Sequence, residues 1–180
     1  MRVKPASWAA AVLVAAACGC SESNDAPPEQ SSPPTRNSPA LDPPPVRQSG
    51  RQFPLDSLQR ADISVNREEL RVYVVQDPPQ QQEGLMYVKE DELGPDEGMI
   101  FVFPASDWRG FWMRNTPIPL DIAYLRPDGT IINVLTMRPY DESRYLSDEK
   151  AKYAVEARAG WFEARDVGPG DRFDLTGLPE

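Results

Sequence analysis

The clearest structural signal in the sequence is the stretch DIAYLRPDGTIINVLTM, which runs from Asp121 to Met137. Two runs rich in apolar and β-branched residues, 121–126 and 130–137, flank the sequence Pro127-Asp128-Gly129. Proline presets the φ angle of a turn, and glycine accepts the left-handed conformations that many turns require. The stretch therefore predicts a β-hairpin, and it points to a β-rich fold.

Further short apolar runs on both sides of this hairpin predict more strands. They cover residues 61–65, 70–75, 98–103, 108–115, 153–157 and 171–175. The first two are joined by polar residues 66–68 and predict a second hairpin. The runs 98–103 and 108–115 are both stopped before a proline, and we expect them to be strands buried on two faces.

Two short helices complete the predicted elements. Asp77 before two prolines is typical of a helix start and predicts a helix over 80–87. A second helix is expected over 161–167, closed by Gly168. A parallel α/β arrangement would need longer crossover helices. The sequence therefore predicts a mainly β fold with minor α, a compact antiparallel β-barrel or sandwich with one or two short helices.

Composition divides the chain into three parts. Residues 1–17 have the features of an export signal, with Arg2 and Lys4 followed by an apolar run too short to span a bilayer. Residues 18–54 are rich in Pro, Ser and Gln and predict a disordered linker. Residues 55–180 have a globular composition and the size of one domain.

The end of the export signal resembles a bacterial lipobox. Small residues precede Cys18, which we favour as the lipidated residue, and Cys20 is the alternative. An ordinary secretory signal with incidental cysteines is the competing interpretation. An Asp directly after the lipidated cysteine resembles an inner-membrane retention signal. Neither Cys18 nor Cys20 is followed by Asp, and this points to the outer membrane. We therefore expect an extracytoplasmic protein, lipid-anchored in the outer membrane and facing the periplasm.

The rest of the composition excludes several kinds of functional site and partner. The chain has no histidine and two cysteines, both beside the signal, so the globular part lacks Ser-His-Asp, Cys-His and ordinary zinc sites. We expect no cofactor and no metal. The net charge of −9, without a basic stripe, argues against nucleic acid as a partner.

Motifs in the globular part resemble a known family. They are Gly84-Leu85-Met86, the stretch EGMIFVF over 97–103 and the stretch FWMRNTPIPLDI over 111–122, with weaker similarity at 153–157 and 167–171. These motifs resemble the domain of unknown function 192 family. The resemblance implies a compact β domain, often exported, without an established reaction or ligand. The polar, acidic segment 140–150 departs from the family pattern.

The motif around Trp112 suggests a binding face. If Phe111 and Met113 point into the core, strand alternation sends Trp108, Trp112 and Arg114 to the other face. With Asn115 and Asp121 nearby, this face is a candidate platform for a small polar ligand or a sugar. In the alternative interpretation, the helix over 80–87 covers Trp112 and Arg114 forms a structural ion pair with Asp121.

Asp121 and Glu156 are motif carboxylates in predicted strands. Two carboxylates can act as acid and base, so a carboxylate-based hydrolase is one alternative function. A structural or protein-partner module is another. Without histidine, an enzyme is not favoured. The preferred hypothesis is a membrane-tethered binding or envelope-accessory domain, with a small polar ligand or an envelope protein as its partner.

Overall fold

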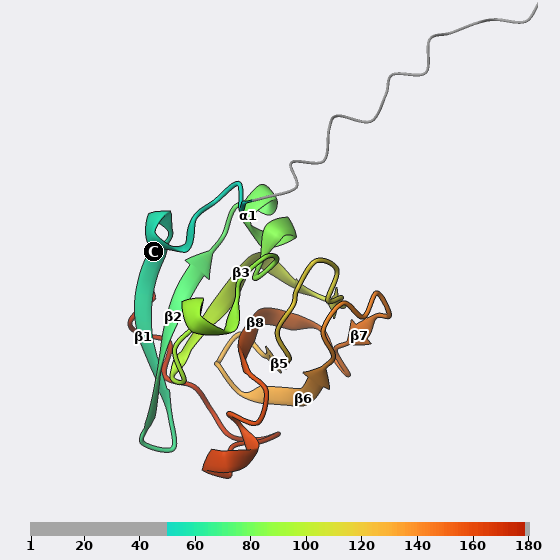
Figure 1. The fold of residues 1–180 in the computed structure, drawn as a ribbon. Coiled ribbons are helices and arrows are strands. Elements are labelled where there is room, and N and C mark those ends of the chain that lie inside the picture. Colours follow the sequence, from blue (N-terminus) through green and yellow to red (C-terminus); the bar gives the residue numbers. More distant parts are fainter. Residues whose placement is uncertain (1–49, 179–180) are drawn as a thin grey trace, which may run out of the picture. The chain divides into compact units, whose positions relative to one another are not determined.

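The computed structural model describes residues 50–178, which form a mainly β domain (Figure 1). The predicted signal, Cys18, Cys20 and nearly all of the predicted linker lie outside these residues. The strands are β1 (Gln59–Val65), β2 (Glu68–Val75), β3 (Glu97–Asp107), β4 (Gly110–Phe111), β5 (Leu120–Leu125), β6 (Ile131–Met137), β7 (Tyr145–Leu146) and β8 (Ala151–Arg158). The helical elements are α1 (Pro78–Glu83) and three 3-10 turns, η1 (Leu55–Ser57), η2 (Glu90–Glu92) and η3 (Glu163–Arg165). Within residues 50–178, no helix has the length and apolar character needed to cross a membrane.

Six strands pair in the order β1-β2-β3-β8-β5-β6, and β4 pairs with β7 in a separate small sheet (Figure 1). Over the described residues the large sheet does not close into a barrel, and a sandwich-like fold fits. The prediction of a mainly β fold with minor α is confirmed. One pairing differs from the expected antiparallel pattern: β2 and β3 are parallel, because the chain returns through α1 and η2 before β3 begins.

Both predicted hairpins are present. β1 and β2 pair antiparallel through a turn in which Asn66 and Arg67 have φ angles of 51° and 74°. β5 and β6 pair antiparallel with a register shift between Tyr124 and Leu125. These hairpins form because alternating apolar residues and a tight turn lie close together in sequence.

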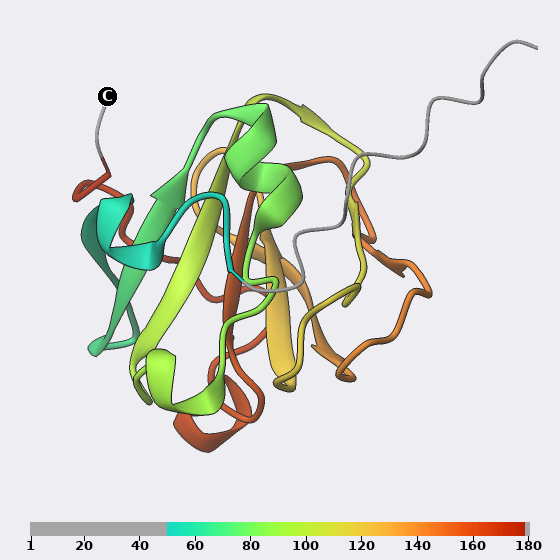
Figure 2. The same cartoon turned by 45° about the horizontal axis from the view of Figure 1, so that its top comes forward.

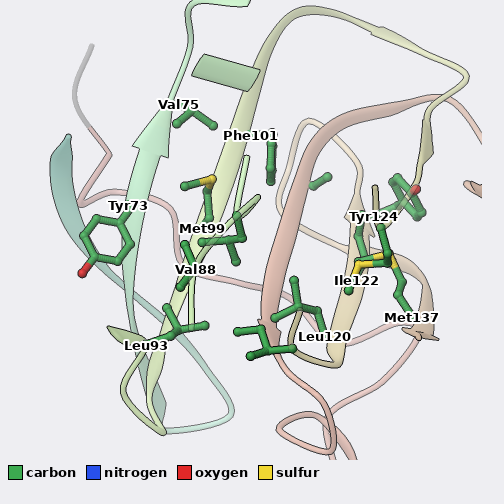
Figure 3. Packing of buried hydrophobic residues seen from close by; sticks show 14 of the residues in the cluster. Tyr73, Val75, Val88, Leu93, Met99, Phe101, Leu120, Ile122, Tyr124 and Met137 are labelled. Atoms are coloured by element: carbon green, nitrogen blue, oxygen red, sulfur yellow. The ribbon is translucent and has the colours of Figure 1, made fainter. Parts of the chain in front are cut away.

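Apolar side chains form one core on each face of the large sheet. The first core lies beneath α1 and the irregular segments 84–93 and 113–118, and Figure 3 shows its members on β3 and β5, among them Met99, Phe101 and Ile122. The second core lies on the other face. There the segment after β8 supplies Trp161, Phe162 and Phe173.

Several predicted elements are shorter than expected. Only Gly110 and Phe111 of the run 108–115 are strand, because their partner β7 is also two residues long. Trp108 has 62% of its surface exposed, so burial on two faces was wrong for this run. The first helix ends at Glu83 instead of residue 87, because Gly84 leaves the helical conformation with a φ of 50°.

The C-terminal predictions were also too long. Of the helix expected over 161–167, only the 3-10 turn η3 forms, and it ends at Arg165, before Asp166, which has a left-handed φ of 52°. The strand expected over 171–175 is reduced to two isolated bridges. They join Asp174 to Ser64 of β1 and Arg172 to Thr130 before β6. The C-terminal segment therefore touches both edge strands of the large sheet.

Candidate functional site

The structure brings some of the sequence-predicted site residues together and separates others. Trp108, Trp112 and Glu156 line one cavity. Arg114 is exposed, and Asn115 lines a neighbouring hollow. The two tryptophans and the buried carboxyl group therefore define the candidate site.

This cavity, called the α1 cavity below, has a volume of about 450 Å³. It lies between α1, β3 and the segment around β4. α1 follows directly on β2 at one end of the large sheet (Figure 2). The lining residues are Pro78, Gln81, Gln82, Glu83, Gly84, Leu85, Met86, Phe101, Phe103, Trp108, Arg109, Gly110, Phe111, Trp112, Thr116, Arg144 and Glu156.

Polar contacts fix α1 over the sheet. The Gln81 side-chain amide donates to the carbonyl oxygens of Val102, at 2.8 Å, and Val75, at 3.3 Å. The Arg51 guanidinium donates to the carbonyl oxygens of Gly84 and Met86, both at 2.8 Å. The Gln81 contacts tie α1 to β2 and β3, and the Arg51 contacts satisfy carbonyl groups just beyond the helix end, so α1 is held as a wall of the cavity.

Aromatic side chains form much of the cavity wall. Phe101 and Phe111 make an edge-to-face contact with ring centroids 4.7 Å apart, and Phe111 meets Tyr124 in the same way at 5.9 Å. Gly84 lies against this wall, since a Cβ there would be 3.3 Å from the Phe101 ring. The packed rings give the cavity a rigid apolar surface.

Glu156 forms the buried end of the cavity. It lies on β8 opposite Met99 of β3 and Ile122 of β5, so its side chain is on the face of the first core. Only 4% of its surface is exposed, and its Oε2 atom has no hydrogen-bond partner among residues 50–178. Burial raises the pKa of Glu156 to about 8, with the Arg51 guanidinium opposing this rise. The carboxyl group is therefore protonated at neutral pH.

Two arginines lie at the solvent side of the cavity. The Arg109 guanidinium stacks over Phe103, with its Cζ atom 3.8 Å from the ring centroid, and donates to the Ala105 carbonyl oxygen at 2.6 Å. The exposed Arg144 donates to the Gly110 carbonyl oxygen at 2.8 Å, and its Cζ atom lies 5.6 Å from the Trp112 ring centroid. Neither arginine forms an ion pair with any residue in the range 50–178.

Asp121 is not part of this site. It pairs with Ala157 on β8, one residue from Glu156, so the two carboxylates project to opposite faces of the sheet. Asp121 accepts hydrogen bonds from the Thr136 hydroxyl and the Gly160 amide, both at 2.7 Å. A hydrolase using Asp121 and Glu156 together is therefore excluded by strand geometry.

The alternative structural interpretation of Trp112 also needs correction. Within residues 50–178 no ion pair joins Arg114 to Asp121; the Arg114 guanidinium instead lies 5.5 Å from the Trp112 ring centroid. No group of three or more His, Cys, Asp or Glu side chains in this part of the chain is arranged to hold a metal ion.

A family model matches residues 61–175, well over half of the chain. It is the model of DUF192, described as an uncharacterized ACR. This chain belongs to the DUF192 family. The matched range contains every residue that lines the α1 cavity, so the cavity belongs to the DUF192 domain itself, whereas Arg51 lies before the matched range.

Two solved structures are similar to this DUF192 protein. A putative transcription regulator from Sinorhizobium meliloti 1021 is 32% identical, with a TM-score of 0.64, and the match covers 67% of this chain and 97% of that one. A protein of unknown function from Novosphingobium aromaticivorans is 31% identical, also with a TM-score of 0.64, and the match covers 68% of this chain and 89% of that one. No curated protein matches the chain.

Sequence reasoning missed several residues of the cavity. Arg109 lies next to Trp108 in the run 108–115, but strand alternation placed it on the core face with Phe111 and Met113, so it was not selected. Arg144 lies in the acidic segment 140–150 and carries no local signal, because β7 brings it to β4 from more than thirty residues away. Phe101 and Phe103 were expected in the core, and the structure adds that they also line the cavity.

Proposed function

We propose that this DUF192 protein is a membrane-tethered, extracytoplasmic binding protein whose domain takes a small ligand in the α1 cavity. The observation that carries the proposal is the unpartnered Oε2 atom of Glu156 in the cavity lining. Leaving a buried polar group without a partner costs about 1–3 kcal/mol, and such a group in a folded protein calls for an explanation. A ligand that hydrogen-bonds to Glu156 supplies one.

The other features of the cavity support the same proposal. Small-molecule sites are typically concave, lined by aromatic side chains and provided with a few polar groups that orient the ligand. The α1 cavity combines five aromatic residues, Phe101, Phe103, Trp108, Phe111 and Trp112, with polar groups at both its buried and its exposed end. Its volume of about 450 Å³ lies within the range of such sites.

A thermal-shift screen tests ligand binding directly. The panel contains monosaccharides, cell-wall fragments and small organic ions, measured with the globular domain and with the variants Trp112→Ala and Tyr140→Ala. We expect at least one compound to raise the unfolding midpoint, and Trp112→Ala to abolish that rise. Tyr140→Ala is the matched control because Tyr140 is an exposed aromatic residue outside the cavity, and it should keep the rise. If no compound raises the midpoint, the proposal of a binding site is wrong.

The tether rests on the sequence of the N-terminal region. Arg2, Lys4 and the apolar run before Cys18 support a lipidated export signal, and the Pro-rich residues 18–54 support a linker of extended reach. Replacing both Cys18 and Cys20 with Ser should abolish incorporation of a labelled fatty acid in cells. The same double variant should no longer be found in the outer-membrane fraction. Labelling equal to that of the unmodified chain would refute the lipid anchor.

A further inference from the structure

The α1 cavity has an unusual charge environment for an acidic chain. The chain carries a net charge of −9, yet neither Arg109 nor Arg144 is paired with a carboxylate within the described residues. The two carboxyl groups in the lining do not offset them. Glu83 accepts hydrogen bonds from the amides of Gln52 and Phe53, and its Oε2 atom lies 3.7 Å from Arg51. Glu156 is neutral at pH 7 because of its burial.

The arginines also occupy the ring faces that a cationic ligand would use. Aromatic cavities attract cations through the negative potential of their ring faces. Here the guanidinium of Arg109 already lies over Phe103, and those of Arg114 and Arg144 lie near Trp112. A second cation at these rings would meet like charge in a partly dehydrated site, so the local field favours an anion.

We propose that the ligand of the α1 cavity is a small organic anion with a flat apolar body, whose anionic group binds between Arg109 and Arg144 and whose far end hydrogen-bonds to Glu156. This inference rests on the proposed function, since it names the ligand class for that site. Guanidinium groups match carboxylate and phosphate oxygens with charge-assisted hydrogen bonds. Each of the two arginines gives only part of its five N–H donors to backbone carbonyls.

The two ends of the cavity differ in a way that orients such a ligand. Arg144 is exposed, whereas Glu156 is buried, so the charged end of the ligand stays near solvent. The protonated carboxyl group of Glu156 can donate one hydrogen bond and accept others, as a ligand hydroxyl or carbonyl group requires. Between these ends, Phe101 and Phe111 offer ring surfaces to an apolar body.

Calorimetric titration with matched aromatic probes tests the ligand class. 4-Hydroxyphenylacetate and 4-hydroxyphenyl phosphate represent the two anionic head groups, 4-hydroxyphenylacetamide is the neutral analogue, and tyramine is the cationic one. We expect at least one anion to bind at least about tenfold more tightly than the amide, the scale of one charge-assisted hydrogen bond. The ratio of the two anions then distinguishes a carboxylate from a phosphate ligand.

Two arginine variants locate the anion. Arg144→Gln should reduce the affinity for the better anion about tenfold, the scale of one charge-assisted hydrogen bond, while Arg109 remains in place. Arg114→Gln is the matched control because Arg114 approaches the same Trp112 ring but does not line the cavity, and it should leave the affinity within about twofold. Phenylacetate lacks the hydroxyl group that would contact Glu156, so the unmodified domain should bind it more weakly than 4-hydroxyphenylacetate. Glu156→Leu should remove this difference, whereas Glu156→Gln keeps a neutral hydrogen-bonding group and should retain binding.

The outcomes separate this inference from the proposed function. Tighter binding of tyramine or of the amide than of both anions would overturn the anion proposal and leave a ligand site in place. If Arg144→Gln and Arg114→Gln weaken anion binding equally, the anion does not contact Arg144 specifically, and the anion proposal is also overturned. If these probes fail and the thermal-shift panel yields only neutral or cationic ligands, the anion proposal is wrong. If the whole panel also fails, both proposals are wrong.

Discussion

The Oε2 atom of Glu156 lies at the buried end of an aromatic cavity, where no group of the described part of the chain forms a hydrogen bond with it. Desolvation disfavours the charged form of a carboxyl group, and this raises the pKa of Glu156 from 4.5 to about 8. A proton on the carboxyl group therefore avoids the much larger cost of a buried charge. A buried, unsatisfied carboxyl group costs stability, and such groups with shifted pKa values are typical of sites that bind or react.

The raised pKa of Glu156 makes the stability of the domain depend on pH in a defined direction. Below about pH 4.5 the folded and unfolded forms are both protonated at this residue. Between about pH 4.5 and 8 only the unfolded form loses its proton, so rising pH favours unfolding. The loss is up to about 1.4 kcal/mol per pH unit. Above about pH 8 both forms are ionised at this residue, and the loss is complete.

Glu156→Gln should remove this dependence, because the amide stays neutral throughout. We expect its thermal midpoint to be close to that of the unmodified domain at pH 5 and clearly higher at pH 8. Differential scanning calorimetry across this range provides the measurement. Glu149→Gln is the control: Arg126, 2.6 Å from Glu149, lowers the pKa of that exposed carboxyl group, so the variant should gain nothing at pH 8. Equal midpoints for Glu156→Gln and the unmodified domain at pH 8 would contradict a protonated Glu156.

At the scale of elements, the β1–β2 hairpin contains a local conflict that can be relieved. Asn66 and Arg67 both have positive φ, as a type I′ turn requires, but only Asn and Gly commonly take this conformation. Arg67 is exposed, so its conformation is set by the turn. Arg67→Gly should raise the free energy of unfolding by about 1 kcal/mol, the scale of the left-handed penalty for a residue with a Cβ.

Urea denaturation measures this gain, and Arg67→Ala provides the matched control. Alanine removes the same side chain but keeps the Cβ, so its free energy of unfolding should stay within about 0.5 kcal/mol of the unmodified domain. A gain for alanine equal to that for glycine would show that the arginine side chain, and not the backbone conformation, is responsible.

The segment around β4 illustrates how an element adapts to a site. Its apolar run predicts a strand, but Asn115 has a left-handed φ of 57° and β7 offers only two residues for pairing. The chain is therefore free to place Trp108, Arg109 and Trp112 around the α1 cavity. Propensity favoured extension, and the lack of a long partner strand overrode it.

At the scale of the molecule, stability depends on covering both faces of one sheet. The second core is covered by the segment that follows β8, in which Phe173 has 1% of its surface exposed and packs edge-to-face on Phe162 with ring centroids 6.4 Å apart. The Phe173 amide also donates to the Gly129 carbonyl oxygen at 3.0 Å. The C-terminal segment is therefore part of the domain core and not a tail.

Phe173→Ala should lower the free energy of unfolding by about 3–5 kcal/mol, as expected for deleting a buried phenylalanine. Chemical denaturation of the purified domain measures this loss. Leu146→Ala is the control, since 58% of the surface of Leu146 is exposed, and it should cost less than about 1 kcal/mol. If Phe173→Ala costs less than about 1 kcal/mol, as the control does, the C-terminal segment does not close the second core.

The sequence alone determined the β-rich class and both hairpins, because their strands, turns and apolar alternation lie within short stretches such as 121–137. It also singled out Trp108, Trp112 and Glu156, whose residue types carry recognisable chemistry. Only the tertiary structure decided which of these residues meet. β8 lies between β3 and β5, so its register turns Glu156 toward the cavity and leaves Asp121 on the other face. Successive residues of a strand point to opposite faces of the sheet, so the sequence leaves two possible choices for which residues face the cavity. The partner strands decide between these choices, and the order of strands that are far apart in the sequence has no local signal.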